Sequence, residues 1–310
     1  MQALQKPKKP MKRLSAATIA DTWLLFITVI WSGTFALIKL ALQEIPPLTF
    51  TAARFTLAFL ASTFVWRSSL SSLSRNRFRQ GVVLGILFGF GFYLQTLGLL
   101  FTSVGNSAFI TGALVVFTPF AYWLIERKRL SIHHIISVAI VFAGLLIFVR
   151  PAAAFNIGDG LTLLSAAGWA LYIVYVDVFT RSVAAHHIWS VTGQLVIVQF
   201  GVTAVLGIAL AFFLESLPSL HSISWQAIGA LLYTALLASV VATGIQTYYQ
   251  RRTTPVRAAL IFALEPVLAA LLGVWILDES FDLWHWIGGT LVISGVLWTE
   301  LRSAAENSSG

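Results

Sequence analysis

The sequence has no cysteine, and only 10% of its 310 residues are charged. The absence of cysteine excludes disulfides, thiolate metal sites and a cysteine nucleophile. A soluble domain carries about 25% charged residues, which cover its water-facing surface. Because 58% of this sequence is apolar and its mean hydropathy is +0.85, we expect most of the exterior to face lipid.

Long apolar runs occupy most of the chain. A bilayer core about 30 Å thick needs roughly 20 apolar residues per helix. The runs are continuous rather than alternating, which favours helices over a transmembrane barrel. The predicted spans are 22–42, 48–66, 81–101, 107–125, 132–149, 160–179, 189–214, 225–249, 258–277 and 283–301. The predicted fold class is an all-α integral membrane protein with ten transmembrane helices.

Positive charge is concentrated at every second connection. Lys and Arg gather in the N-terminal tail 1–21, after the second, fourth, sixth and eighth spans, and in the tail 302–310, whereas Arg150 is on the other side. Cytoplasmic loops carry an excess of Lys and Arg, so both termini are predicted to be cytoplasmic in an inner (plasma) membrane. The net charge of +8 then points to anionic lipid headgroups as partners, and not to nucleic acid.

The sequence also resembles itself. A shift of 151 positions places 95–146 on 246–297 without a gap, and a shift of 138 pairs Trp31 with Trp169. This indicates two halves of five helices, 22–149 and 160–301. Because five is odd, the second half must enter the membrane from the opposite side. Such inverted repeats recur in secondary transporters, which bind substrate near the midplane between the repeats.

The last two predicted spans carry a recognisable pattern. Its residues are Glu265 and Pro266 before small and apolar residues, Asp278 and Glu279 at the span end, then Gly288, Gly289 and Gly295. Pro119, Glu126 and Gly144 repeat it more loosely, although Pro119 and Pro266 do not correspond under the 151 shift. This pattern, with Trp31, Gly33 and Arg54, resembles the drug/metabolite transporter superfamily, EamA-type. The resemblance implies ten helices, alternating access and export or exchange of amino acids or related metabolites.

Ionisable residues inside a span usually face a cavity or a partner, because a charge at the helix centre costs about 2.5–3.5 kcal/mol. Glu265 is a candidate for coupling transport to protons or for contacting an amino group; a structural hydrogen bond to a neighbouring helix is the alternative. Arg54 is a candidate for attracting a carboxylate, and an ion pair within the protein or snorkelling are its alternatives. Pro266 should kink its helix near Phe262 and could form a gate.

Aromatic and polar residues complete the predicted site. Trp31 and Trp169 lie near span centres, away from the interfaces where Trp is common. We expect them to line a midplane cavity, with Phe35 and Tyr172 on the same helix faces. Four further residues are candidates for the same cavity, with hydrogen bonding between helices as the alternative: Tyr93, Gln95, Gln246 and Tyr248.

Three glycines recur every four residues in the third span, at Gly81, Gly85 and Gly89. Small residues at this spacing let helices approach closely. We expect this face to pack within a monomer, with a weak dimer as the alternative. Gly85 is also the candidate for a contact that slides during gating.

The predicted function is a secondary transporter that exports amino acids or related compounds by alternating access. A membrane-embedded transferase for lipid-linked substrates would need an acid–base cluster at one interface, and the polar residues are isolated. A receptor without transport is the other alternative. The adjacent histidine pairs lack carboxylates that would complete a metal site. We therefore expect no catalytic residue, metal or cofactor, and a small molecule, lipids and, for coupling, protons as partners.

Overall fold

The computed structural model describes residues 15–128, 131–149, 155–216, 223–277 and 282–308, and the regular elements in these ranges are all helical. Arg150, Asp278 and Glu279 lie outside them. The α-helices are α1 (Ala16–Ser32), α2 (Thr34–Ala41), α3 (Pro47–Val65), α4 (Arg75–Phe101), α5 (Val104–Gly112), α6 (Leu114–Glu126), α7 (Ile132–Val149), α8 (Ile157–Thr180), α9 (Ile188–Leu214), α10 (Trp225–Leu232), α11 (Ala242–Tyr249), α12 (Pro255–Phe262), α13 (Glu265–Leu277) and α14 (Leu283–Ser308). A π-helix, η3 (Tyr233–Val241), joins α10 to α11.

Every predicted span contains helix. Within the described residues, seven helices or helix series are long and apolar enough to cross a membrane, and Ile132–Phe148 is a shorter apolar helix. Several helices begin before the predicted boundaries. α1 begins at Ala16 because Ser15 caps it, and α4 begins at Arg75 because the Ser74 side chain accepts a hydrogen bond from the Arg77 N–H. Hydropathy alone does not locate these capped helix starts.

Four of the predicted spans are not uniform α-helices. The first is broken at Gly33, the fourth at Ala113, and the ninth at residues 263–264. The ninth break lies one turn before Pro266, where proline removes a hydrogen bond and its ring clashes with the preceding turn. In the eighth, the π-helix is accompanied by a hydrogen bond from Ser239 Oγ to the Thr234 carbonyl, five residues back. Such π segments occur often at functional sites.

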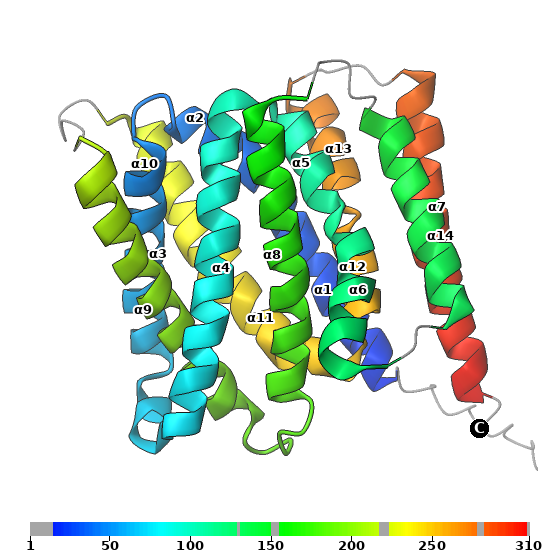
Figure 1. Ribbon diagram of the computed structural model, residues 1–310, viewed down its shortest axis with the longest axis horizontal. Coiled ribbons are helices and arrows are strands. Elements are labelled where there is room, and N and C mark those ends of the chain that lie inside the picture. Colours follow the sequence, from blue (N-terminus) through cyan, green and yellow to red (C-terminus); the bar gives the residue numbers. More distant parts are fainter. Residues whose placement is uncertain (1–14, 129–130, 150–154, 217–222, 278–281, 309–310) are drawn as a thin grey trace, which may run out of the picture.

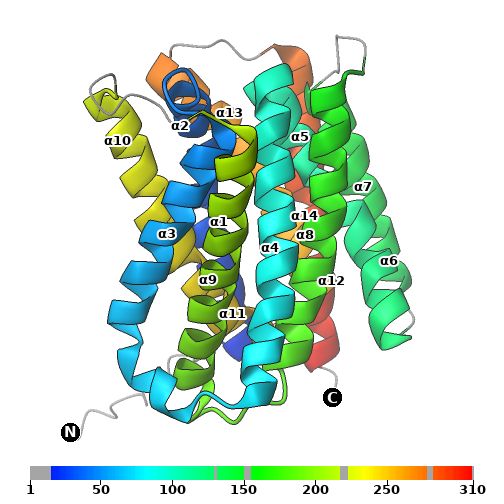
Figure 2. The ribbon, with the colours of Figure 1, turned by 60° about the vertical axis from the view of Figure 1, so that its left-hand side comes forward.

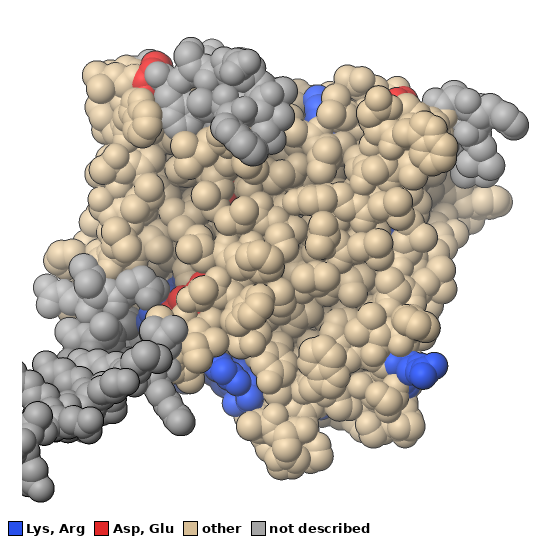
Figure 3. Space-filling view, turned by 180° about the vertical axis from the view of Figure 1, so that it is seen from behind, with Lys and Arg blue, Asp and Glu red and all other residues tan. Residues whose placement is uncertain are grey.

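The helices form one bundle whose connections alternate between its two ends (Figures 1 and 2). α1 begins and α14 ends at the same lower end. α4 packs on α8 and α9, α3 on α9, and α7 runs beside α14 at one edge. Seen from behind, few charged side chains interrupt the broad middle band of the surface (Figure 3). An apolar band between charged edges is the surface that a bilayer requires.

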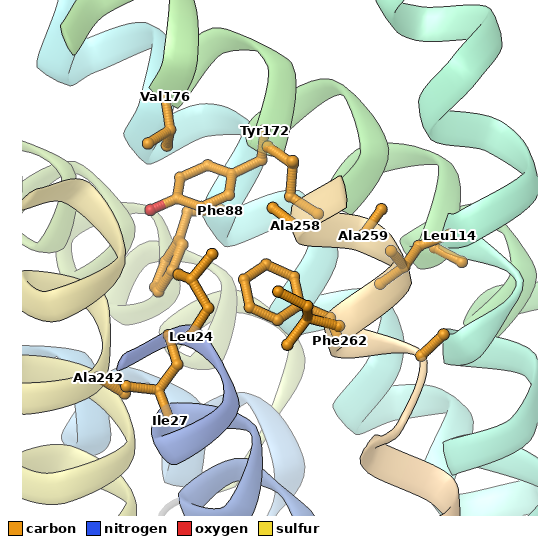
Figure 4. Packing of buried hydrophobic residues seen from close by; sticks show 14 of the residues in the cluster. Leu24, Ile27, Phe88, Leu114, Tyr172, Val176, Ala242, Ala258, Ala259 and Phe262 are labelled. Carbon is orange, nitrogen blue, oxygen red and sulfur yellow. The ribbon is translucent and has the colours of Figure 1, made fainter. Parts of the chain in front are cut away.

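The core joins helices from both halves of the chain. Leu24 and Ile27 of α1, Phe88 of α4 and Tyr172 of α8 belong to one buried cluster with Phe262 of α12 (Figure 4). Gly81 and Gly85 face α9, since a Cβ atom on either would lie 2.6–2.7 Å from a valine of that helix. The glycine face is thus occupied within the chain, as expected.

Candidate functional site

A cavity of about 60 Å³ lies where the broken helices meet. Its walls come from both halves of the chain: Trp31, Thr34, Arg54, Phe88, Phe92, Gln95, Thr111, Leu114, Trp169, Tyr172, Ile173, Ala238, Thr243, Gln246, Phe262 and Glu265. At roughly 15 Å³ per water position, this space holds about four waters. It must widen to admit a metabolite larger than that.

Arg54 supplies positive charge to the cavity. Its side chain is only 1% exposed, so it turns inward and does not snorkel to the membrane surface. The Nε–H donates to Ser239 Oγ of the π-helix at 3.0 Å, and the guanidinium lies 4.3 Å from the centre of the Phe92 ring. Within the described residues it has no carboxylate partner, so its remaining N–H groups are available to an anion.

Glu265 supplies negative charge to the same cavity. It is the first residue of α13, directly after the break that follows Phe262. The side chain is buried, and the described residues give its carboxylate neither a hydrogen bond nor an ion pair. A buried unpaired charge is costly, so such a carboxylate is expected to be protonated or to bind a cationic group. The cavity therefore holds one basic and one acidic side chain, which form no ion pair with each other within the described residues.

Aromatic rings enclose these two groups. Trp31 donates its indole N–H to the Ala238 carbonyl at 2.9 Å and meets the Phe262 ring edge to face at 5.2 Å. Trp169 packs edge to face on Phe92 at 4.6 Å between ring centres. Both tryptophans thus line the cavity, and other aromatic rings surround them.

Amide and hydroxyl groups form the polar part of the wall. Gln95 donates to Thr111 Oγ1 at 2.9 Å, and Gln246 donates to Gln250 Oε1 at 2.9 Å. The buried Thr243 Oγ1 has no hydrogen-bond partner within the described residues. A buried polar atom left in this way needs a water or a ligand.

Three predicted site residues are not among the lining residues. Phe35 packs in a separate cluster with Ile38, because the break at Gly33 ends the i,i+4 relation with Trp31. Tyr93 lies on the α9 side of α4 and donates to the Thr203 carbonyl at 2.7 Å. Tyr248 packs near Trp189. Each tyrosine is two residues from a glutamine that lines the cavity. Two residues are about 200° apart around an α-helix, so the tyrosine and its neighbouring glutamine cannot both face the cavity.

The two predicted gating residues also lie outside the cavity wall. Pro266 is the second residue of α13, directly after Glu265, and a Cβ atom on Gly112 would lie 3.5 Å from its ring. It therefore stands where the two broken helices α5 and α13 meet. Gly85 faces Val202 and Gln199 of α9.

Several lining residues escape simple sequence reasoning. Phe88, Phe92 and Phe262 are apolar residues in apolar helices, so their types carry no signal. The internal shifts could have found two others from predicted residues, since 138 relates Tyr172 to Thr34 and 151 relates Glu265 to Leu114.

Comparison with known proteins assigns the chain to a family. The sequence profile of the EamA-like transporter family matches twice, over residues 18–150 and 156–301. An uncharacterized transporter of Archaeoglobus fulgidus is 30% identical over 91% of this chain and 86% of its own length. A probable amino-acid metabolite efflux pump of Escherichia coli K12 is 25% identical over 88% of this chain and 91% of its own. A crystal structure with a TM-score of 0.74 and 18% identity, covering 94% of this chain and 99% of the other, has the same fold. The chain is a multi-pass membrane protein and belongs to the EamA-like transporter family.

Proposed function

We propose that the chain crosses the inner membrane ten times, as two inverted five-helix repeats, and exports amino acids or related metabolites by alternating access. The two family matches, 18–150 and 156–301, support the division into halves. The common end of α1 and α14 supports an even number of crossings (Figure 2). The basic connections gather at that end, and the positive-inside rule supports placing it on the cytoplasmic side.

The observation that carries the proposal is the internal symmetry of the cavity. Six pairs of lining residues are related by the two shifts within the sequence. The shift of 138 pairs Trp31 with Trp169 and Thr34 with Tyr172; that of 151 pairs Phe92 with Thr243, Gln95 with Gln246, Thr111 with Phe262 and Leu114 with Glu265. A cavity on the axis between inverted repeats recruits equivalent positions from both, and transporters bind substrate there.

Charge and shape favour an amino acid as the substrate. Arg54 can bind a carboxylate through its free N–H groups, and Glu265 can bind an ammonium group. The rings of Trp31 and Trp169 provide apolar walls for the rest of the molecule. The probable amino-acid efflux pumps of Escherichia coli and Salmonella typhimurium, both 25% identical to this chain, agree with this choice.

Transport by the purified protein in proteoliposomes tests the function. Vesicles preloaded with unlabelled amino acid should accumulate a labelled amino acid by exchange, and a panel of unlabelled compounds should compete in the order of their affinity. Glu265→Gln removes the charge at nearly constant shape, so it should weaken binding of an amino acid more than of its N-acetyl derivative. Saturable binding without exchange would instead identify a receptor.

The absence of cysteine allows a direct test of the inverted repeat. Single cysteines at positions 103 and 254 need no other change in the chain; they are related by the 151 shift and are the exposed N-caps of α5 and α12. Equivalent helix ends of inverted repeats should lie on opposite sides of the membrane, so a charged thiol reagent should reach one of them from outside and the other from inside. Both cysteines reacting from one side only would contradict the inverted arrangement and leave transport itself open.

A further inference from the structure

A second cavity differs in its chemistry from the substrate cavity. It is a groove of about 640 Å³ between α6 and α7, which diverge at one side of the bundle (Figure 1). Its lining is almost wholly apolar: Val116, Pro119, Phe120, Trp123, Ile135, Val138, Ala139 and Phe142. Phe120 and Trp123 are 67% and 50% exposed, so the groove opens toward the lipid. Its form and chemistry fit an acyl chain.

Arg127 stands at one end of this groove. It follows α6 directly, and its guanidinium lies 6.0 Å from the ring centre of Trp123, a groove residue. Arg127 is exposed and has no acidic partner within the described residues, whereas neighbouring Lys128 pairs with Glu126 at 3.6 Å. The groove therefore ends at a cation that is available to an anion.

The backbone of Arg127 gives an independent indication. With φ 56°, it is the one non-glycine residue of the described chain in the left-handed region. Glycine is the usual residue at this position after a helix, because a Cβ atom is unfavourable there. An arginine in a backbone conformation that favours glycine carries a conformational cost, which points to a use for its side chain.

We propose that the groove between α6 and α7 binds one anionic phospholipid. An acyl chain lies along the groove, and the phosphate is held by Arg127 beside Trp123. The headgroup lies at the basic end of the bundle, where anionic lipids of the cytoplasmic leaflet attract Lys and Arg. The site is separate from the substrate cavity and does not depend on what is transported.

Native mass spectrometry of the purified full-length protein, with phosphatidylglycerol and phosphatidylcholine of equal chain length supplied together, tests this proposal. Wild type should retain one phosphatidylglycerol in preference to phosphatidylcholine. Arg127→Gly should lower that preference about fivefold, as expected for one basic residue near an anionic surface. Arg127→Lys should keep most of it, and Arg79→Gln, an exposed arginine away from the groove, should keep all of it.

The same variants separate binding from folding. Arg127→Gly replaces a disfavoured residue with a favoured one, so its melting temperature should equal or exceed that of wild type. Ala139→Phe fills the groove and should displace both lipids, whereas Ala209→Phe on the exposed face of α9 should not. Undiminished preference for phosphatidylglycerol in Arg127→Gly would overturn the proposal. So would a wild-type dimer that Ala139→Phe dissociates, since the groove would then be an interface between copies.

Discussion

Arg54 gives the sharpest test of the substrate cavity, because its contacts separate charge from geometry. The guanidinium is nearly fully buried, donates to Ser239 Oγ at 3.0 Å and stacks 4.3 Å from the centre of Phe92. Arg54→Lys keeps the positive charge but loses the hydrogen bond to Ser239 and the planar fork that grips a carboxylate at two points. Arg54→Met removes the charge and keeps an unbranched side chain about as long as the arginine stem up to Nε.

The size of the effect follows from the bonds that are lost. A hydrogen bond to a charged group contributes about 1.5–3 kcal/mol, so losing one from a bidentate pair should weaken carboxylate binding by roughly 10–150-fold. Arg54→Met, which loses both, should be affected more than Arg54→Lys. Ser239→Ala leaves Arg54 in place but frees it to rotate, and should cost about 0.5–1.5 kcal/mol, or roughly 2–10-fold.

The assay compares an amino acid with the matching amine that lacks the carboxylate. Binding constants from equilibrium titration of the purified protein should show that wild type distinguishes the two ligands and that Arg54→Met does not. Melting temperatures for each variant without ligand separate loss of the site from loss of the fold. If Arg54→Met weakens both ligands equally, Arg54 does not contact the carboxylate and the predicted binding mode is wrong.

Three further perturbations test other parts of the structure. Glu215 accepts hydrogen bonds from the backbone N–H groups of Leu48 and Thr49 at the start of α3, so Glu215→Ala should lower the free energy of unfolding by about 1–2 kcal/mol, measured by denaturant titration in detergent. Gly85→Leu should separate α4 from α9 and reduce transport; normal transport by a well-folded variant would exclude a gating role. Hydrogen bonding from the backbone N–H of Ser224 lowers the pKa of Glu44 in the folded protein. The ionised Glu44 carboxylate therefore stabilises the fold above the ordinary glutamate pKa, and this stabilisation is lost as the pH falls through the lowered pKa. Glu44→Gln should lessen the fall in melting temperature on acidification.

The helices could largely be predicted because long apolar runs have one stable arrangement in lipid. The first turns of α1 and α4 could not, since capping bonds of Ser15 and Ser74 set where these helices begin, and hydropathy does not measure such bonds. The π-helix leaves no trace in hydropathy either. One of its carbonyls, that of Ala238, accepts the indole N–H of Trp31 from another helix, a contact that hydropathy does not reveal.

The candidate site was predictable where a residue type is unusual for its surroundings. Arg54 and Glu265 in apolar spans, and Trp31 at a span centre, were found for this reason. Phe35 was misplaced because helical spacing was carried across the break at Gly33, where the two helix segments no longer share a register. Thr243 was not identified because threonine in a membrane helix usually bonds its own backbone, and only the structure shows that its hydroxyl has no such partner.

The positions that line the cavity are related by the internal repeat, but its ionisable residues are not, and these two facts bear differently on how the cavity opens. The helix breaks at Ala113 and at residues 263–264 correspond under the 151 shift, so each proposed repeat is interrupted at an equivalent position. We propose that both breaks act as hinges, since equivalent hinges suit a site that opens to either side of the membrane. Charge does not follow the symmetry, because Glu265 corresponds to Leu114. Since Glu265 is the first residue after its hinge, an ammonium group bound there would act on only one of the two hinges. Substrate binding can therefore favour opening toward one side of the membrane, although the two halves of the protein are otherwise equivalent.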